Sequence, residues 1–571
     1  MPTVRTRRRG VAPPHAILRL LLPLLLLAAV ATTSGCGSSD GSGGATAATT
    51  ASADADALPS GGRAVDGGTL TYAADTEPEH LDPGVAGTDA AALAVRNVVD
   101  SLVAQSLDGE PLPWLASEWT VSDDGRVYEF RLRDGVRFHD GEPFDAAAVK
   151  ANFDRLLGPQ ESPGGAQSLV EPIKRVTVVD PSTVRFTLKR PYAPFLTSLS
   201  HAFLGIVSPA QLAGDRASLP TRPIGTGPFR VVKWNKGSDL TLERNPDYAW
   251  APEGAANQGP PHLDQVVFRY LPEGSVRAGT LTSGQADVAL SIPPVALDGI
   301  ARNPRLAVSR YDDPGANYVL FLNTRKAPTD DVRVRQALLH AIDVEPIVRS
   351  LYRGAFAAPL SILSPTTLGY TPVESAVAYD PDLSARLLDE AGWSERDADG
   401  YRVKDGRRLR LDWPTVAEFQ ARDDRTTFQQ LVQSAARRAG FELDLRPTPN
   451  TKIVTPMVGG DYNALDFSNK SPDPDILYDL FGSRRTLDQG GANMSKFADP
   501  EVDRWLAEGQ ASQERGAREA AYAQVQERLL EQAVALPFYV HPTIVGVGRH
   551  VRGLEWTPAA SLSLQGAWLE R

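Results

Sequence analysis

Residues 115–156 read LASEWTVSDDGRVYEFRLRDGVRFHDGEPFDAAAVKANFDRL, and both strand and helix patterns occur in them. Apolar and polar residues alternate through RVYEFRLRD and GVRFHDGEPF, which predicts two strands, and Asp-Gly turns at 124–125, 134–135 and 140–141 interrupt them. From Asp145 the period changes, and DAAAVKANFDRLL predicts a helix over 145–157 with Asp145 as its N-cap. Strands followed directly by a capped helix indicate an α/β fold.

The same mixture of strands and helices continues on both sides of this stretch. GTLTYAA at 68–74 predicts an opening strand, and a helix is expected over 89–105 with Asp89 as N-cap. Beyond it, 173–190 predicts a hairpin that turns at Asp180-Pro181. RLRLDWPT, a helix at about 424–439 and FELDLRP form a strand–helix–strand unit, which predicts a parallel pair with a crossover helix.

The last long helix is expected over about 513–533. One face of it carries four residues that we interpret as core: Tyr522, Val525, Leu529 and Ala533.

Composition excludes several classes of protein. The chain has 571 residues, enough for two to four domains, and 42% of them are hydrophobic. Its formal net charge of −11 excludes a nucleic-acid binder built on a basic surface, because phosphate neutralisation needs positive charge. The single cysteine, Cys36, excludes a disulfide framework and zinc sites built on paired cysteines.

The N-terminal segment predicts export. Arginines at 5 and 7–9 precede an apolar run at 18–31 that is shorter than the roughly 20 residues of a permanent membrane span, so we expect a signal peptide over 1–35. TTSGC at 32–36 resembles the bacterial lipobox, although Thr33 departs from its usual leucine, and this predicts lipidation of Cys36. The alternative is ordinary secretion with an unmodified thiol. Residues 36–66 follow as the lipidated cysteine and a flexible tether rich in Gly, Ser, Ala and Thr.

Motifs for enzymatic chemistry are missing from the sequence. No Gly-Lys dipeptide occurs, so the chain has no Walker A loop, and no H-E-x-x-H, C-x-x-C or S-x-x-K occurs. The eight histidines are too scattered for a helical pair of metal ligands. The acidic cluster of Asp473, Asp475 and Asp479 lacks the spacing of a calcium loop, and helix capping by Asp473 or Asp475 is the expected role. These absences favour a binding protein without cofactors over an enzyme.

A series of segments resembles the extracytoplasmic solute-binding proteins of ABC importers, family 5, of the peptide/nickel/oligosaccharide type. The series covers essentially everything from Gly67 onward and includes 115–156 almost residue for residue. Its other members, in order, are LDP (81–83), PIGTGPFRV (223–231), LERNPDYAW (242–250), SGQADVAL (283–290), DDVRVRQALLHAID (330–343), FADPEVDRWL (497–506) and LPFYVHP (536–542). Gly225-Thr226-Gly227-Pro228 is interpreted as a turn that needs positive φ.

The resemblance implies a two-lobed, periplasmic-binding-protein-like α/β clamshell (type II, cluster C) with an extra domain on lobe I. The boundaries expected are 67–108, 209–310 and 546–571 for lobe I, 109–208 for the extra domain and 311–545 for lobe II. It implies capture of a peptide or peptide-like solute between the lobes and delivery to ABC permease subunits with separate ATPases. A monomer anchored to the outer face of the cell membrane by its lipid is expected.

The resemblance also suggests where the solute lies. Peptide-binding members commonly hold the substrate's amino terminus with an aspartate, and the family spacing places Lys470 there, while a shifted alignment brings Asp466 into that position. A lysine repels an ammonium group and attracts an anion, which favours an acidic, amidated or sugar-like solute over a zwitterionic peptide. The candidate ligand-binding residues are Thr88, Asp89, Asn317, Tyr318, Asp466, Ser468, Asn469, Lys470 and Asn493, with Gly87 beside them.

Two other functions stay open at this point. One is a secreted hydrolase on a similar scaffold, and the other is a sensor or chaperone-like lipoprotein that binds peptides without transport. A nucleophile, base and orienting residue that converge between the lobes would favour the hydrolase.

Overall fold

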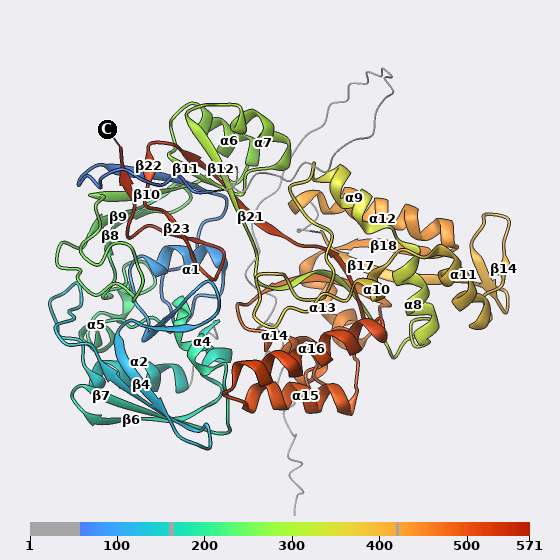
Figure 1. Cartoon of the computed structure of the whole chain (residues 1–571), viewed down its shortest axis with the longest axis horizontal. Coiled ribbons are helices and arrows are strands. Elements are labelled where there is room, and N and C mark those ends of the chain that lie inside the picture. The colour runs from blue at the N-terminus through green and yellow to red at the C-terminus, as the bar shows by residue number, and fades with distance from the viewer. Residues whose placement is uncertain (1–56, 159–164, 418–421, 571) are drawn as a thin grey trace, which may run out of the picture.

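The computed structural model describes residues 57–158, 165–417 and 422–570, and these form two lobes (Figure 1). The expected signal peptide, Cys36 and most of the tether lie outside the described residues. Among the described residues no helix is long and apolar enough to cross a membrane.

Lobe I is built on a mixed seven-stranded sheet of order β12-β21-β11-β1-β10-β9-β8. Its first strand pairs in parallel with β10 and β11, and β21 comes from the far end of the sequence to lie between β11 and β12. The strands are β1 (Thr69–Ala74), β8 (Phe229–Asn235), β9 (Asp239–Arg244), β10 (Gln265–Tyr270), β11 (Val288–Leu290), β12 (Leu306–Asp312) and β21 (Pro542–Gly548). The helices are α1 (Asp89–Arg96), α6 (Gly274–Thr282) and α7 (Pro294–Ala301).

Several two-stranded pairs complete lobe I. They are β22 (Val551–Arg552) with β25 (Trp568–Leu569), β23 (Glu555–Trp556) with β24 (Leu562–Ser563), and β2 (Val103–Gln105), which pairs with β3 (Pro111–Pro113) at the start of the extra domain.

A four-stranded antiparallel sheet of order β4-β5-β7-β6 extends lobe I as an extra domain (Figure 1). It has a core of its own, in which the rings of Phe130, Phe153 and Phe186 meet edge to face. Its strands are β4 (Ala116–Val121), β5 (Val127–Leu132), β6 (Ile173–Asp180) and β7 (Thr183–Leu188). The helices beside it are α2 (Ala146–Leu157), α3 (Ala166–Val170), α4 (Phe195–Ser200) and α5 (Pro209–Ala213).

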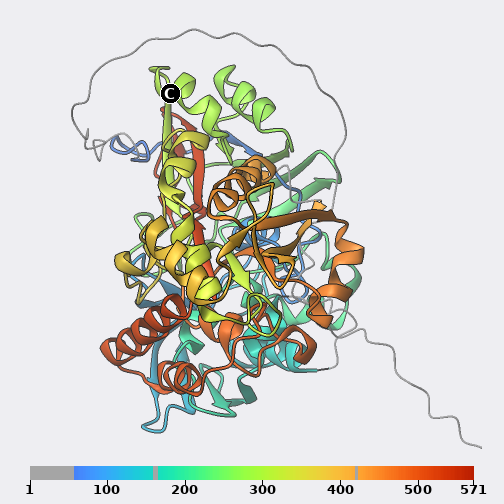
Figure 2. The same ribbon diagram turned by 90° about the vertical axis from the view of Figure 1, so that its right-hand side faces the viewer.

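Lobe II contains the sheet β19-β13-β20, the parallel pair β17–β18 and the small sheet β14-β15-β16. Its strands are β13 (Gly315–Leu322), β14 (Glu395–Arg396), β15 (Arg402–Lys404), β16 (Arg407–Arg408), β17 (Arg410–Val416), β18 (Glu442–Thr448), β19 (Ala464–Lys470) and β20 (Ala535–Tyr539). Its helices are α8 (Val332–Ala341), α9 (Val344–Leu351), α10 (Glu374–Val377), α11 (Pro381–Glu390), α12 (Arg425–Ala439), α13 (Asn450–Gly459), α14 (Ile476–Phe481), α15 (Pro500–Ala511) and α16 (Arg515–Glu531). Figure 2 views the molecule with this lobe toward the reader.

Most local predictions are confirmed. The opening strand is β1, and Asp145 caps α2 by accepting a hydrogen bond from the Ala148 N–H at 2.8 Å. The hairpin that turns at Asp180-Pro181 is β6–β7. The strand–helix–strand unit is β17–α12–β18 with a parallel pair, and the apolar face of α16 is buried as expected.

The helix predicted over 89–105 is wrong in both its cap and its length. Thr88 is the N-cap, because its hydroxyl accepts a hydrogen bond from the Ala91 N–H, and α1 ends at Arg96. The carbonyls of Asn97 and Val98 accept hydrogen bonds from Phe229 and Gly227 instead of from later residues of a helix. Backbone N–H groups of a distant segment thus bond the carbonyls that would have accepted the next hydrogen bonds of the helix.

The strand predicted in GVRFHDGEPF is also wrong. Two Asp-Gly turns close together leave only an isolated bridge between Arg137 and Pro143. Backbone hydrogen bonds within the loop, from Phe138 to Glu142 and from Phe144 to Val136, replace pairing with a neighbouring strand.

The Gly225-Thr226-Gly227 turn needs glycine for a reason other than the one predicted. Neither glycine has positive φ; instead, a Cβ at either position would collide with the backbone of Val98. Close approach of two backbones therefore selects glycine here. Thr226 between them donates a hydrogen bond to the buried carboxylate of Asp100 at 2.9 Å, which ties this turn to the end of α1.

Replacing Gly225 by alanine is expected to lower the free energy of unfolding by about 1–3 kcal/mol, because the added methyl group overpacks against the Val98 backbone. The matched control is Gly279→Ala in α6, where no atom lies within 4 Å of the added Cβ. That change is expected to raise the free energy by about 0.5–1 kcal/mol, since alanine favours helix. Urea unfolding of both variants checks the pair, and equal effects at the two positions would contradict it.

Candidate functional site

The chain passes between the lobes at two crossings that lie side by side. The first joins β12 to β13 through Asp313, and the second joins β20 to β21 through His541. The Asp313 N–H donates a hydrogen bond to the His541 carbonyl at 2.8 Å, and the imidazole Nδ1 lies 2.9 Å from Asp313 Oδ2. The two crossings are therefore bound to each other by backbone and side chain.

Charged residues gather around this pair, and we call Asp313, Asp423, Lys470, His541 and Thr543 the crossing cluster. Lys470 Nζ lies 3.0 Å from Asp313 Oδ1 and donates to Thr543 Oγ1 at 3.2 Å, while Thr543 donates to Asp313 at 2.6 Å. His541 Nε2 lies 3.3 Å from Asp423 Oδ1. Cations and carboxylates alternate, so each charge has an opposite neighbour.

The pKa values of the cluster follow from these contacts. Burial alone would raise the pKa of Asp313, but Lys470 and His541 outweigh it and lower the pKa to about 2. Burial alone would lower the pKa of His541, but the carboxylates of Asp423 and Asp313 outweigh it and raise the pKa to about 9. At neutral pH the pair is therefore an imidazolium facing a carboxylate.

Lys470 also reaches lobe I. Its Nζ lies 4.0 Å from Oδ2 of Asp89, the first residue of α1, whose side chain is 76% exposed. The Thr88 hydroxyl and the Gly87 N–H beside it are already engaged, since both donate to the carboxylate of Glu79. Of the predicted ligand-binding residues, Lys470 and Asp89 are thus brought face to face from opposite lobes.

Asp466 lies deeper in lobe II, and three hydrogen-bond donors from the same lobe bind its carboxylate. It accepts hydrogen bonds from the hydroxyl of Tyr318, from Trp413 Nε1 at 2.7 Å and from Gln429 Nε2 at 3.1 Å. The guanidinium of Arg425 lies over the Tyr318 ring, 4.7 Å from its centroid. The negative charge of Asp466 is therefore held inside lobe II.

Two predicted residues are buried asparagines with backbone partners. Asn317 is 2% exposed and donates to the carbonyls of Ser361 and Leu363, and Asn493 is 0% exposed and donates to Gly482 and Phe497. Tyr318, also predicted, is 0% exposed. The structure brings none of these three to the surface of lobe II.

Ser468 and Asn469 occupy half-buried positions on β19, between Asp466 and Lys470. Asn469 Nδ2 is buried and has no hydrogen-bond partner among the described residues. Together with Lys470 and Asp89, these two are the predicted residues that can meet a solute between the lobes.

Sequence reasoning missed Asp313, Asp423 and His541, which organise the cluster. Their signal is weak: DDP at 312–314 and HP at 541–542 each place a charged or titratable residue directly before a proline. The partners lie far apart in sequence, so no local spacing reveals them.

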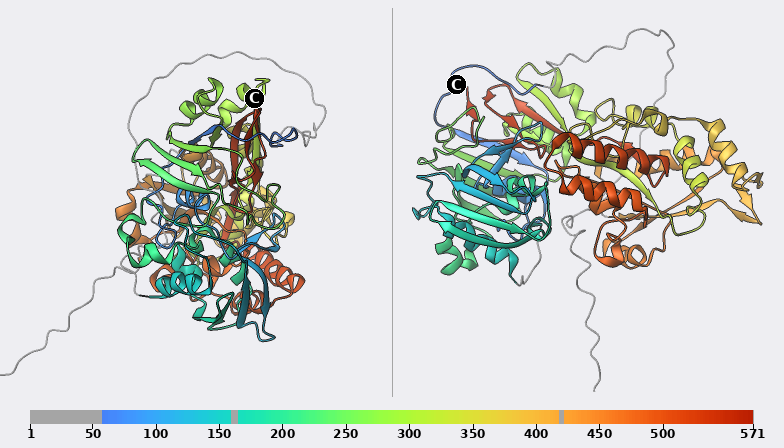
Figure 3. Two further views of the ribbon diagram at one scale, coloured as in Figure 1. Left: turned by 90° about the vertical axis from the view of Figure 1, so that its left-hand side faces the viewer. Right: turned by 60° about the horizontal axis from the view of Figure 1, so that its bottom comes forward.

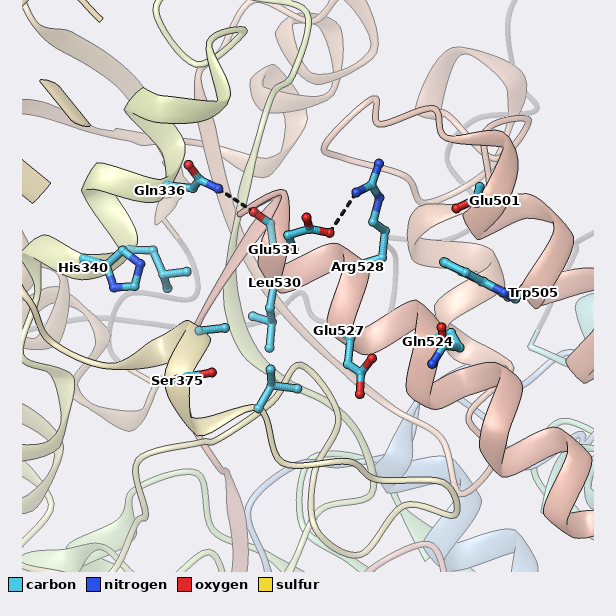
Figure 4. Close-up of a pocket in the computed structure, with 13 residues that line it drawn as sticks. Gln336, His340, Ser375, Glu501, Trp505, Gln524, Glu527, Arg528, Leu530 and Glu531 are labelled. Atoms are coloured by element: carbon cyan, nitrogen blue, oxygen red, sulfur yellow. Dashed lines mark hydrogen bonds and ion pairs between the residues drawn. The ribbon is translucent and has the colours of Figure 1, made fainter. Parts of the chain in front are cut away.

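Figure 4 shows a separate pocket of about 600 Å³ in lobe II. Helices α8, α10, α15 and α16 line it, with Gln336, Trp505 and Glu527 among its residues. Two of its charged groups bind each other, since Arg528 Nη1 lies 2.8 Å from Glu531 Oε2. All of its lining residues belong to lobe II, so it does not lie between the lobes.

Comparison with known proteins gives a consistent result. Residues 110–487 match the family model described as bacterial extracellular solute-binding proteins, family 5 Middle. The dipeptide-binding protein of Escherichia coli K12 is 27% identical over 88% of this chain and 95% of its own length. The probable di/tripeptide-binding protein 5 of Pseudomonas aeruginosa UCBPP-PA14 is 30% identical over 86% and 93%.

Two solved structures are similar along nearly their whole length. NikA from Brucella suis in complex with Fe(III)-EDTA has a TM-score of 0.77 and 27% identity, covering 88% of this chain and 100% of that chain. The periplasmic binding protein DppA from Helicobacter pylori in complex with peptide STSA has a TM-score of 0.70 and 25% identity, covering 89% and 99%.

The His541 interaction predicts a pH dependence of stability. The folded-state pKa is about 9, above the unfolded value of about 6.5, so the stabilisation is complete below pH 6.5 and is lost as pH rises through 9. The free energy of unfolding is expected to fall by on the order of 3 kcal/mol over this range. Urea unfolding at pH 6.5 and pH 9.5 measures it.

His541→Gln is expected to remove most of the difference in the free energy of unfolding between pH 6.5 and pH 9.5. His550→Gln is the control, because His550 is about half exposed and pairs with Asp287 outside the crossings. Parallel pH curves for wild type and His541→Gln would show that the imidazolium does not stabilise the fold.

Proposed function

The chain belongs to the bacterial extracellular solute-binding proteins of family 5, and from this premise we propose that it captures a peptide-like solute between its lobes and delivers it to ABC permease subunits. Its role as the substrate-binding component of an ABC importer follows from the family. The observation that carries the proposal is the arrangement of Lys470 and Asp89, which face each other from opposite lobes beside the two crossings.

The chemistry of capture follows from this arrangement. A solute that contacts both lobes binds the closed form more tightly than the open form, and the difference in affinity drives closure. Asp89 lies on lobe I, and Ser468, Asn469 and Lys470 are the last three residues of β19 on lobe II. We propose these four as the contacts nearest the solute.

Lys470 supports a preference among peptide-like solutes. Its ammonium is bound to Asp313 on one side, while the exposed Asp89 carboxylate on the other side is 4.0 Å away. An anionic group of a solute can take the place of Asp89 opposite this ammonium, whereas a free amino terminus is repelled. We therefore propose an acidic, amidated or sugar-like solute in preference to a zwitterionic peptide.

The remaining parts of the proposal concern organisation. The lobe boundaries proposed are 67–108, 209–310 and 546–571 for lobe I, 109–208 for the extra domain and 311–545 for lobe II. The partners proposed are permease subunits with separate ATPases, and the protein is proposed to act as a monomer. The relatives are binding proteins, which supports a function without catalysis by this chain.

Calorimetric titration tests the solute class. N-acetylated di- to pentapeptides are expected to bind at least tenfold more tightly than the same peptides with free amino termini, and acidic peptides at least tenfold more tightly than neutral ones. Lys470→Gln is expected to reduce both affinity ratios severalfold. Lys233→Gln on exposed β8 is the control and is expected to leave the ratio unchanged. Tight binding of unmodified peptides that is insensitive to Lys470→Gln would refute the preference.

Lipid attachment has its own test. Expression of the full chain in bacteria fed an alkyne fatty acid is expected to label the protein, and Cys36→Ser is expected to abolish both the label and membrane association. A variant that stays in the membrane fraction after Cys36→Ser would exclude the anchor.

A further inference from the structure

The acidic segment SPDPD at 471–475 has a different role from the one predicted. Asp475 stands at the N-cap position of α14, yet its carboxylate accepts no hydrogen bond from that helix. Asp473 instead accepts the Asp475 N–H at 2.9 Å and pairs with Arg518 at 2.7 Å. Capping by the Asp475 side chain is therefore wrong, and its carboxylate serves another contact.

That contact joins lobe II to the extra domain. Asp475 Oδ2 accepts a hydrogen bond from the hydroxyl of Tyr192 at 2.9 Å, and Oδ1 accepts bonds from Gln510 Nε2 at 2.8 Å and from the Tyr522 hydroxyl at 3.1 Å. Tyr192 belongs to the extra domain, and the other three residues belong to lobe II. We call these four residues the interlobe cluster.

Neighbouring bonds strengthen the same surface. Arg190 of the extra domain donates to Gln510 Oε1 at 2.6 Å, and the Ala193 N–H donates to the Gln510 carbonyl at 2.7 Å. Gln513 donates to the Tyr128 hydroxyl at 3.0 Å. Figures 1 and 3 both place α15 and α16 against the extra domain.

The geometry makes this contact sensitive to closure. In Figure 1 β21 runs from the crossings into lobe I in the upper half of the view, and α15 and α16 meet the extra domain below. The crossings are covalent and persist, whereas the interlobe cluster is held by side-chain hydrogen bonds. A rotation about the crossings that separates the lobes must withdraw Tyr192 from Asp475 and admit water to the carboxylate.

We propose that Tyr192 and Asp475 are positioning residues for capture, which hold the closed form together and link closure to uptake of a proton by Asp475. The inference rests on the proposed function only in that closure serves capture.

The charges around Asp475 agree with this linkage. Burial of its carboxylate, with the charge of Asp473 next, raises the pKa to about 7. From lobe II it faces Asp473 on its own loop, Asp479 on α14, and Arg518 and Tyr522 on α16. From the extra domain it faces Tyr192, with Arg190 beside it. Arg518 is engaged with Asp473, and Asp479 is paired with Arg485 at 2.6 Å, so each of these two acids has a cation of its own.

The sign of the effect is then fixed. Opening exposes the carboxylate to water and lowers its pKa toward the ordinary value of 3.8, so the closed form binds more protons than the open form. Closure is therefore favoured at low pH and weakens as pH rises through about 7. The equilibrium constant for closure is expected to fall about tenfold between pH 6 and pH 8.

The test measures lobe separation without any solute, so its failure is distinguishable from failure of the proposed function. Spin labels are placed at Val179→Cys on β6 and Ala520→Cys on α16, both exposed, in the full chain carrying Cys36→Ser. Distance distributions are recorded by pulsed electron resonance between pH 6 and pH 8. The short-distance population is expected to fall as pH rises.

Three variants separate the roles. Asp475→Asn keeps the shape but cannot ionise, so its distribution is expected to lose the pH dependence. Tyr192→Phe is expected to lower the short-distance population severalfold at pH 6. Tyr462→Phe is the control, because its hydroxyl bonds Met494 inside lobe II, and it is expected to close as wild type does.

Either of two results overturns the proposal. One is a pH dependence that is absent from wild type or is kept by Asp475→Asn, and the other is a Tyr192→Phe variant that matches wild type. Thermal unfolding of each variant verifies that it is folded before its distances are interpreted.

Discussion

The hydrogen-bonded pair of chain crossings is the constraint on which the rest of the structure depends. Asp313 and His541 bind each other through backbone and side chain, so the two connections between the lobes act as one joint. Charges on both sides of this joint alternate in sign, with Lys470 and Asp423 at the ends. Removing one member of such a network costs more than the pair contributes, because its neighbours remain buried without a counter-charge.

The lobes meet in two ways that differ in kind. At the crossings the contact is covalent, and at the interlobe cluster it is the hydrogen bond from Tyr192 to the Asp475 carboxylate, with bonds from Arg190 and Ala193 to Gln510 beside it. The proposed solute contacts of Lys470 and Asp89 lie beside the crossings, whereas the interlobe cluster lies at the extra domain. Closure can therefore be controlled from the extra domain, away from the groups that recognise the solute.

Helices and strands were predictable from sequence where the residues that determine them lie close together in the chain. The periodicity and N-cap of α2, and the crossover unit β17–α12–β18, depend on residues a few positions apart. The helix after Asp89 was overestimated because its continuation is prevented by backbone bonds from 227–229, which no window around position 97 contains.

The site was predictable only in part for the same reason. Lys470 and Asp89 were identified and lie opposite each other. Asparagine often contacts ligands, but the side-chain amides of Asn317 and Asn493 donate hydrogen bonds to backbone carbonyls instead. The sequence does not distinguish these two situations. Asp313 and His541 are 228 positions apart and became neighbours only through the fold.

The place of β21 in the lobe I sheet has a consequence for the order of folding. This strand, at 542–548, lies between β11 and β12, so the sheet is interrupted until that segment is available. Lobe I begins before lobe II in the chain yet cannot be completed before lobe II has been synthesised. Until residues 542–548 have been synthesised, the edges of β11 and β12 that pair with β21 stay unpaired and can pair with a strand of another chain.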